Sequence, residues 1–386
     1  MNRFFLCAAV LTLATHAFAA DPLKIGMITT LSGPAGYLGQ DIRDGFNLRV
    51  EIENGKLGGV PVDVIVQDDA LKPGQGKQIA ERMLKTDHIR LFTGIAFSNV
   101  LEAVAPDILD AKAVIIGANA APSSYAGADC DANYFVVPWQ NTAVHEAVAS
   151  NANDLNFQKV FIVMPNYQAG KDAVDGFKRY FKGKVVGEIY TRLDQTDFSV
   201  ELTQIRAAKP DAVLEFQPGG LGITFIRQYQ QAGLEASIPL IVSAQAIDSH
   251  ILAAVGDAAV GINVSTHWNS DFENAANKLF VTEYTKKYGR TPSIYASQGY
   301  DTAVAISAAL KQNGEKFGDV TSFRKAMLSA KIESIRGNFR FGKNQHPVQD
   351  WWAATVVKGE DGKPKLVTRK KIMSDYGDSF AASCKI

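Results

Sequence analysis

Short apolar segments recur along the chain about every 20 to 30 residues, and each is followed by Gly, Pro, Ser or Asn and then by an amphipathic stretch. Parallel strands that are buried on both faces have continuous sequences of Val, Ile and Leu. Amphipathic stretches between them are typical of surface helices. This alternation predicts an α/β fold with parallel sheets. The predicted strands are 25–29, 62–67, 91–94, 114–117, 135–137, 160–164, 185–190, 213–217, 240–242 and 261–264.

The amphipathic segments predict helices, which come in two series followed by a different pattern. After Trp268, three helices follow one another with little strand between them, and we expect them to pack back on the first sheet. The tail alternates as β hairpins do, at 339–341, 352–357 and 366–368. The predicted helices are 41–54, 75–85, 99–110, 142–153, 171–181, 198–208, 223–232, 249–255, 273–288, 300–311 and 322–329.

A chain of 386 residues is too long for one ordinary core, so two domains are expected. No linker rich in Pro, Gly or Ser separates the two series. We therefore predict two Rossmann-like lobes joined by three crossovers, near 137–140, 265–268 and 345–347, which would act as a hinge. The first lobe would comprise 20–138 and 269–345, and the second lobe and C-terminal tail 139–268 and 346–386.

The first residues are typical of a secretory signal peptide. Arg3 supplies a positive charge, an apolar segment follows, and small residues precede Ala19, which predicts that residues 1–19 are removed by cleavage. An uncleaved anchor is the alternative, but the apolar segment is shorter than the roughly 20 residues that span a bilayer. Removal of this peptide leaves Cys130 and Cys384, which we expect to form a disulfide in an oxidising compartment, with two free thiols as the alternative.

The charges balance, with 40 Lys and Arg against 40 Asp and Glu, so no basic stripe predicts a nucleic-acid partner. A zinc-protease helix would require His-Glu-x-x-His, but after His145-Glu146 the position of the second histidine is taken by Ala149. A dinucleotide fingerprint at Gly220 fails because Phe225 takes the place of the third glycine. The remaining histidines have no metal-ligand spacing, and we predict neither a metal, nor a cofactor, nor catalysis.

The first predicted strand ends in a Gly and Pro loop within 24–39, KIGMITTLSGPAGYLG. Open α/β sheets bind ligands at the carboxyl ends of their strands, so this loop is expected at the ligand site. It lacks a phosphate-binding pattern, and Tyr37 would supply contact at the edge of the cleft.

Several segments match a known family in order: 25–34 (IGMITTLSGP), 59–69 (GVPVDVIVQDD) and 117–122 (GANAAP). The chain resembles the leucine/isoleucine/valine-binding type of periplasmic solute-binding protein, the receptor of an ABC importer. The resemblance runs from Leu23 to the C-terminus. It implies a monomeric periplasmic receptor that closes on a small solute and docks on an inner-membrane permease. A secreted enzyme, a sensor and an amide or urea receptor remain as other readings.

In that family, the loops after the third and fourth strands hold the carboxylate of the ligand. Ser98 stands at the start of a predicted helix, where free N–H groups favour an anion, although it could also simply cap that helix. In the family, a tyrosine in the loop after the first strand of the second lobe faces the ligand. Tyr167 matches it in this chain, with ordinary packing of a half-buried ring as the alternative. The resemblance implies ligand contacts from Ser98, Asn99, Ala118, Asn119, Tyr167, Gln217 and Gln245, with Trp139, Gln140 and Trp268 at the hinge.

One departure from the family concerns the ligand. Amino-acid receptors place a glutamate where this chain has Gln245, and a buried ammonium without a carboxylate partner is costly. Segments 119–122, 137–141 and 383–385 are similar to a branch that includes receptors for aromatic carboxylic acids. We therefore expect a carboxylate with an apolar, aromatic body and no α-amine, with a branched-chain or other apolar amino acid as the alternative.

Overall fold

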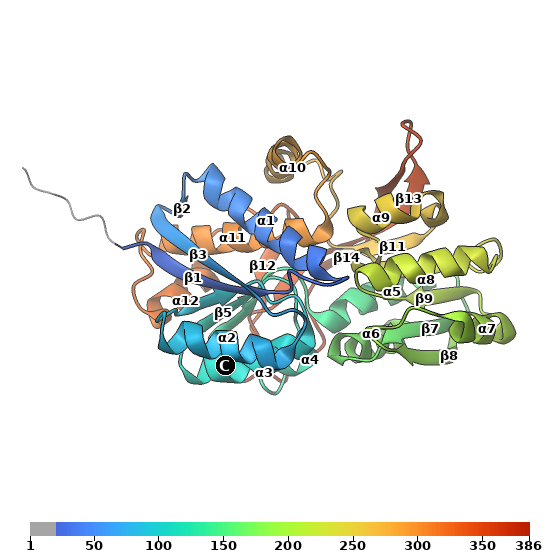
Figure 1. Ribbon diagram of the computed structural model, residues 1–386, viewed down its shortest axis with the longest axis horizontal. Coiled ribbons are helices and arrows are strands. Elements are labelled where there is room, and N and C mark those ends of the chain that lie inside the picture. Colours follow the sequence, from blue (N-terminus) through green and yellow to red (C-terminus); the bar gives the residue numbers. More distant parts are fainter. Residues whose placement is uncertain (1–20) are drawn as a thin grey trace, which may run out of the picture.

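The computed structural model describes residues 21–386, which form two α/β lobes lying side by side along the long axis (Figure 1). The predicted signal peptide lies outside the described residues. Within residues 21–386, no helix combines the length and the apolar character needed to cross a membrane.

The first lobe contains a six-stranded sheet in the order β2-β3-β1-β4-β5-β6. Its strands are parallel apart from the short hairpin of β2 and β3, and the strands β1, β4, β5 and β6 are almost wholly buried. The elements are β1 (Leu23–Thr29), α1 (Gly36–Ile52), β2 (Lys56–Leu57), β3 (Val60–Asp68), α2 (Pro73–Lys85), β4 (Leu91–Thr93), α3 (Ser98–Asp110), β5 (Val114–Gly117), α4 (Ser123–Ala126) and β6 (Tyr134–Val136).

The second lobe is built on an eight-stranded sheet ordered β12-β13-β11-β10-β9-β7-β8, with β14 paired to β13. The strands β7 to β11 are parallel, as their continuous apolar sequences predicted. The elements are α5 (Asn141–Asp154), β7 (Lys159–Pro165), α6 (Gln168–Tyr180), β8 (Lys184–Thr191), α7 (Ser199–Ala208), β9 (Ala212–Glu215), α8 (Gly220–Gln231), β10 (Leu240–Ser243), η1 (Ala244–Ala246), α9 (Ser249–Val255), η2 (Gly256–Ala259) and β11 (Asn263–Thr266).

The three late helices are α10 (Ala275–Tyr288), α11 (Ile294–Gln312) and α12 (Val320–Ser329). α11 packs tightly against α1 of the first lobe, as expected from the sequence. A Cβ atom on Gly45 would lie 1.9 Å from the Ala296 carbonyl oxygen, and one on Gly299 would lie 1.9 Å from that of Ile42. Only glycine allows the two helix backbones to come this close.

The tail forms β12 (Phe339–Phe341) and the antiparallel hairpin of β13 (Pro347–Lys358) with β14 (Pro364–Tyr376). β12 falls within the residues that we assigned to the first lobe. Its backbone pairs with β13 in the second sheet, whereas its phenylalanines pack in the core of the first lobe. The chain then ends at the first lobe, where the predicted Cys130–Cys384 disulfide is present with the Cα atoms 5.6 Å apart.

The chain crosses between the lobes three times: after β6, after β11 and before β13. Aromatic rings at the first two crossings and in β13, just after the third, pack in a row: the ring centres of Trp139 and His267 are 5.2 Å apart and those of His267 and Trp351 are 5.5 Å apart. The buried Arg336 binds the Pro138 carbonyl oxygen at 2.9 Å and Asp301 at 2.8 Å, and it also donates to the side chain of Gln349. Arg336 therefore links the first and third crossings.

Candidate functional site

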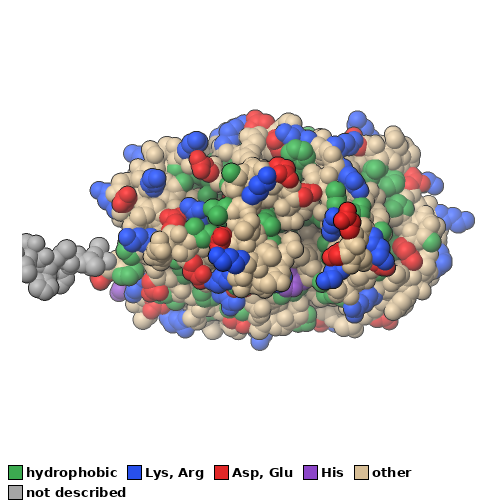
Figure 2. Space-filling model, turned by 90° about the horizontal axis from the view of Figure 1, so that it is seen from above, with side chains coloured by type: hydrophobic (Ala, Val, Ile, Leu, Met, Phe, Trp, Pro, Cys, Tyr) green, Lys and Arg blue, Asp and Glu red, His purple; other side chains and the backbone are tan. Residues whose placement is uncertain are grey.

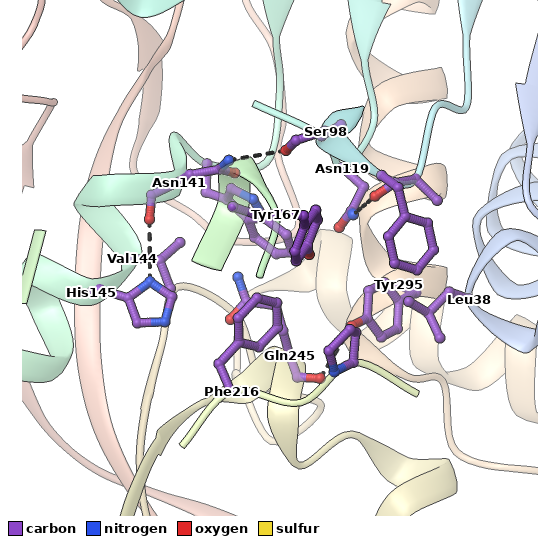
Figure 3. Close-up of a pocket in the computed structure, with 16 residues that line it drawn as sticks. Leu38, Ser98, Asn119, Asn141, Val144, His145, Tyr167, Phe216, Gln245 and Tyr295 are labelled. Atoms are coloured by element: carbon purple, nitrogen blue, oxygen red, sulfur yellow. Dashed lines mark hydrogen bonds between the residues drawn. The ribbon is translucent and has the colours of Figure 1, made fainter. Parts of the chain in front are cut away.

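A narrow cavity lies between the lobes at the carboxyl ends of their strands, and the roughly 430 Å³ of space among its lining atoms includes part of the open solvent at its mouth. The close-up of Figure 3 shows the labelled lining residues, from elements of both lobes, arranged around the cavity. The cavity is lined by Leu38, Ala96, Phe97, Ser98, Asn119, Ala120, Trp139, Asn141, Val144, His145, Tyr167, Ala169, Phe216, Pro218, Gln245 and Tyr295.

The N-terminus of α3 faces this cavity. Phe97 is the N-cap residue and makes no side-chain cap bond, so the N–H groups of Ser98 and Asn99 have no partner within residues 21–386, whereas the Val100 N–H bonds the Phe97 carbonyl oxygen at 3.1 Å. Ser98 is the first helical residue and is 2% exposed, and its Oγ accepts a 3.1 Å bond from Asn141 Nδ2. The alternative that Ser98 caps its own helix is therefore wrong. Its hydroxyl proton can be donated into the cavity.

Asn119 extends from the loop after β5, next to Ser98 in the first-lobe wall (Figure 3). Its Nδ2 donates to the Ala96 carbonyl oxygen, which fixes the side-chain amide and leaves one Nδ2 hydrogen free. Its Oδ1 is buried and has no partner among residues 21–386. The Asn119 amide can therefore both donate to and accept from a ligand.

Aromatic rings form the walls from both lobes. Phe97 and Tyr167, the N-cap residues of α3 and α6, come from different lobes, and their ring centres are 6.1 Å apart. Tyr295, from α11, donates a 3.1 Å bond to the Gln245 carbonyl oxygen in η1, so the two lobes touch here. Burial raises the pKa of both tyrosines, and their hydroxyl groups stay neutral near pH 7.

His145 lines the second-lobe wall from α5 and is 3% exposed. Its Nδ1 lies 3.2 Å from the Asn141 carbonyl oxygen, and its ring centre is 5.7 Å from that of Phe216. Burial lowers the pKa of His145 to about 4, so the ring is uncharged near neutral pH.

None of the sixteen described lining residues is Asp, Glu, Lys or Arg. The buried carboxylate of Asp172, in α6, is used elsewhere. It accepts bonds from Ser123 Oγ at 2.7 Å, Asn141 Nδ2 at 3.0 Å and Gln168 Nε2 at 2.9 Å, and thereby joins the lobes beside the cavity. The cavity thus holds neutral donors and acceptors between apolar walls.

The structure places five of the residues singled out from the sequence on the cavity wall: Ser98, Asn119, Tyr167, Gln245 and Trp139. Of the rest, Asn99 and Ala118 are neighbours of lining residues without lining the cavity themselves. Gln217 lies just after β9 and does not line the cavity: its Oε1 accepts a 3.0 Å bond from Thr191 Oγ1, and Phe216 and Pro218 line the cavity instead.

The other three residues lie at the lobe contact or the hinge. Tyr37 donates to Asp248 beside the cavity. Gln140 caps α5 by accepting from the N–H groups of Thr142 and Ala143, both at 3.0 Å. Trp268 is buried, and its Nε1 donates a 2.7 Å bond to Asn277.

Sequence reasoning missed Asn141, His145, Phe216 and Tyr295 as lining residues. The spacing of Asn141 and His145, four residues apart on one helix, was the only signal for that pair. No sequence signal pointed to Tyr295, because the helix was predicted to begin at Tyr300, whereas α11 begins at Ile294. Ser293 explains the earlier start, since its Oγ caps the helix by accepting from the Ala296 N–H.

Comparisons with known proteins agree with this geometry. The family model described as periplasmic binding protein matches residues 22–363. The Leu/Ile/Val-binding protein homolog 6 of Brucella melitensis is 28% identical over 376 residues, which cover 94% of this chain and 95% of that relative.

Two solved structures carry the same fold. A solute-binding protein of an ABC transporter from R. palustris, in complex with benzoate, is 29% identical, has a TM-score of 0.89 and matches over 95% of this chain and 100% of its own. Another, from Rhodopseudomonas palustris BisB5 in complex with 3,4-dihydroxybenzoic acid, is 28% identical and has a TM-score of 0.87. The match covers 93% of this chain and 99% of that chain. These proteins are receptors for solutes and not enzymes. The chain belongs to the periplasmic binding protein family, as a substrate-binding protein of an ABC transporter of the branched-chain amino acid type.

Proposed function

We propose that this receptor closes on a small carboxylate with an apolar, aromatic body and no α-amine. The observation that carries the proposal is a cavity between the lobes that has aromatic walls and, among residues 21–386, no acidic lining residue. An α-ammonium buried there would lack a carboxylate partner, and that is costly.

The carboxylate would lie at the N-terminus of α3. Free N–H groups and the helix dipole favour an anion at such a position, and the Ser98 hydroxyl adds a donor. The second Nδ2 hydrogen of Asn119 points from the same wall. No lysine or arginine is required for an anion bound in this way.

The body of the ligand would lie among the rings of Phe97, Tyr167, Phe216 and Tyr295. Aromatic side chains favour offset or edge-on contact with another ring. Two structural neighbours, each in complex with a benzoic acid, support an aromatic ligand for this chain as well.

A branched-chain amino acid is the second candidate, because the Brucella melitensis relative is named a Leu/Ile/Val-binding protein homolog. Isothermal titration of the purified protein with benzoate and with L-leucine separates the two. We expect saturable binding of benzoate and none of L-leucine. Binding of L-leucine but not of benzoate would reject the aromatic-acid proposal, and mass spectrometry of solute released from denatured protein would identify the natural ligand.

In the cell, we propose that the loaded receptor is a periplasmic monomer that delivers its solute to an inner-membrane permease. The family supports a soluble receptor outside the cytoplasm, and the charges of both signs interspersed over the face in Figure 2 support a protein without a nucleic-acid partner. Size-exclusion chromatography with light scattering measures the molar mass in solution, and the mass of a single chain is the expected result.

A further inference from the structure

We infer that the ligand carries a hydrogen-bond donor on its ring, above all a hydroxyl group, and that His145 Nε2 accepts the bond. The inference rests on the proposed function, because it takes an aromatic carboxylate as the occupant. It goes further by naming the ring substituent and the residue that selects it.

The position of the His145 proton follows from its neighbours. Nδ1 lies 3.2 Å from the Asn141 carbonyl oxygen, which can only accept, so Nδ1 carries the hydrogen. Nε2 is then an acceptor with a free lone pair. It is buried and has no hydrogen-bond partner anywhere in residues 21–386, although the side chain lines the cavity (Figure 3).

A buried acceptor without a partner is costly, so an occupant that supplies a donor is favoured over one that does not. The low pKa of His145, about 4 through burial, keeps Nε2 unprotonated at neutral pH. A site built to accept from a hydroxyl also rejects the analogue that lacks it. Unsubstituted benzoate offers no such donor, whereas a ring hydroxyl does.

Asn119 Oδ1 is the other fully buried lining acceptor without a partner in the described chain, and it comes from the first lobe. The two acceptors therefore face the ligand from opposite sides. Variants at His145 and Asn119 can show which of the two acceptors binds the hydroxyl group of the ligand.

Isothermal titration would compare benzoate, the three monohydroxybenzoates and the methoxy ether of the preferred isomer. For the native protein, we expect the preferred hydroxybenzoate to bind at least about tenfold more tightly than both benzoate and the ether. In His145→Phe, this preference should fall to about twofold or less, and in Asn119→Ala it should persist. Circular dichroism and thermal melting would verify that both variants are folded.

The inference is overturned if the native protein binds benzoate as tightly as every hydroxybenzoate, or if the preference survives in His145→Phe. It is equally overturned if only Asn119→Ala removes the preference. If neither benzoate nor any hydroxybenzoate binds, the proposed function itself fails. Should His145→Phe not fold, nitrogen NMR of the native protein decides, because the His145 Nε2 signal must shift with the hydroxybenzoate and not with benzoate.

Discussion

The Tyr37 hydroxyl donates a 2.6 Å hydrogen bond to Asp248 Oδ2, and this bond joins α1 of the first lobe to the start of α9 in the second. The other carboxylate oxygen of Asp248 caps α9 by accepting from the His250 and Ile251 N–H groups. The ring of Tyr37 also packs on that of His250, with centres 4.5 Å apart. The residue that caps α9, Asp248, therefore also forms a contact between the two lobes.

Tyr37→Phe keeps the ring and removes this bond. Because the bond exists only when the lobes are together, we expect ligand affinity to fall by about three- to tenfold, as suits the loss of one hydrogen bond. The melting temperature without ligand should change little. Titration calorimetry measures the effect, with Tyr190→Phe as a control because that side chain is 38% exposed. Equal losses in both variants would contradict the prediction.

His250 predicts a pH dependence of closure. Its Nε2 is 3.0 Å from Asp41 Oδ2 across the lobes, and this hydrogen bond raises the pKa of His250 above its ordinary value of 6.5. A raised histidine pKa stabilises the closed form below pH about 6.5, and this contribution is lost as pH rises through the raised pKa. Affinity should therefore weaken as the pH rises above about 6.5, and His250→Gln should flatten the profile. An unchanged profile in the variant would assign the dependence to another group.

Glu215 lies fully buried in β9, and neither carboxyl oxygen has a hydrogen-bond partner in the described part of the chain. Burial raises its pKa well above 4.5, so it stays protonated in the folded protein while the unfolded chain ionises. Stability should therefore decline as pH rises above about 4.5. We expect Glu215→Gln to raise the free energy of unfolding by about 1 to 3 kcal/mol at pH 7 and hardly at all at pH 4.5. Urea melts at both pH values test this, and an equal shift at both would refute it.

Arg336 should be essential to the hinge, because it is 6% exposed and holds Asp301 and two of the three crossings. Arg336→Met leaves the Asp301 carboxylate buried without its cation, which should cost about 3 to 5 kcal/mol. Arg340→Met is a matched control, since its ion pair with Asp375 is more than half exposed and should contribute about 1 kcal/mol or less. Denaturant melts compare the two, and similar losses would argue against a hinge role.

Gln245→Glu tests which wall faces the ligand. A carboxylate added to the second-lobe wall shares a small cavity with the bound carboxylate and repels it, and we expect benzoate affinity to fall at least about tenfold. Gln245→Met removes the same amide without adding charge and should cost less. Benzoate affinity that Gln245→Glu leaves unchanged would mean that this residue does not contact the anion.

The sequence located part of the cavity because the carboxyl ends of parallel strands meet at one edge of a sheet. This rule, together with the family resemblance, pointed to Ser98, Asn119, Tyr167 and Gln245, and these four residues line the cavity. It failed at Gln217, in the loop after β9: with a shift of one residue to either side, Phe216 and Pro218 line the cavity, while the Gln217 side chain accepts from Thr191. No pattern could resolve that shift.

The sequence alone determined the fold class, the order of strands and helices, and the cysteine pair, because each of these follows from local periodicity or from a count of residues. Only the tertiary structure decided that Tyr37 meets Asp248, 211 positions away, and that Tyr295 of α11 closes the cavity. It also decided that His145 keeps an unpaired acceptor inside the cavity. Contacts between distant segments depend on how whole lobes pack, and side-chain periodicity within one segment carries no information about its partner in another.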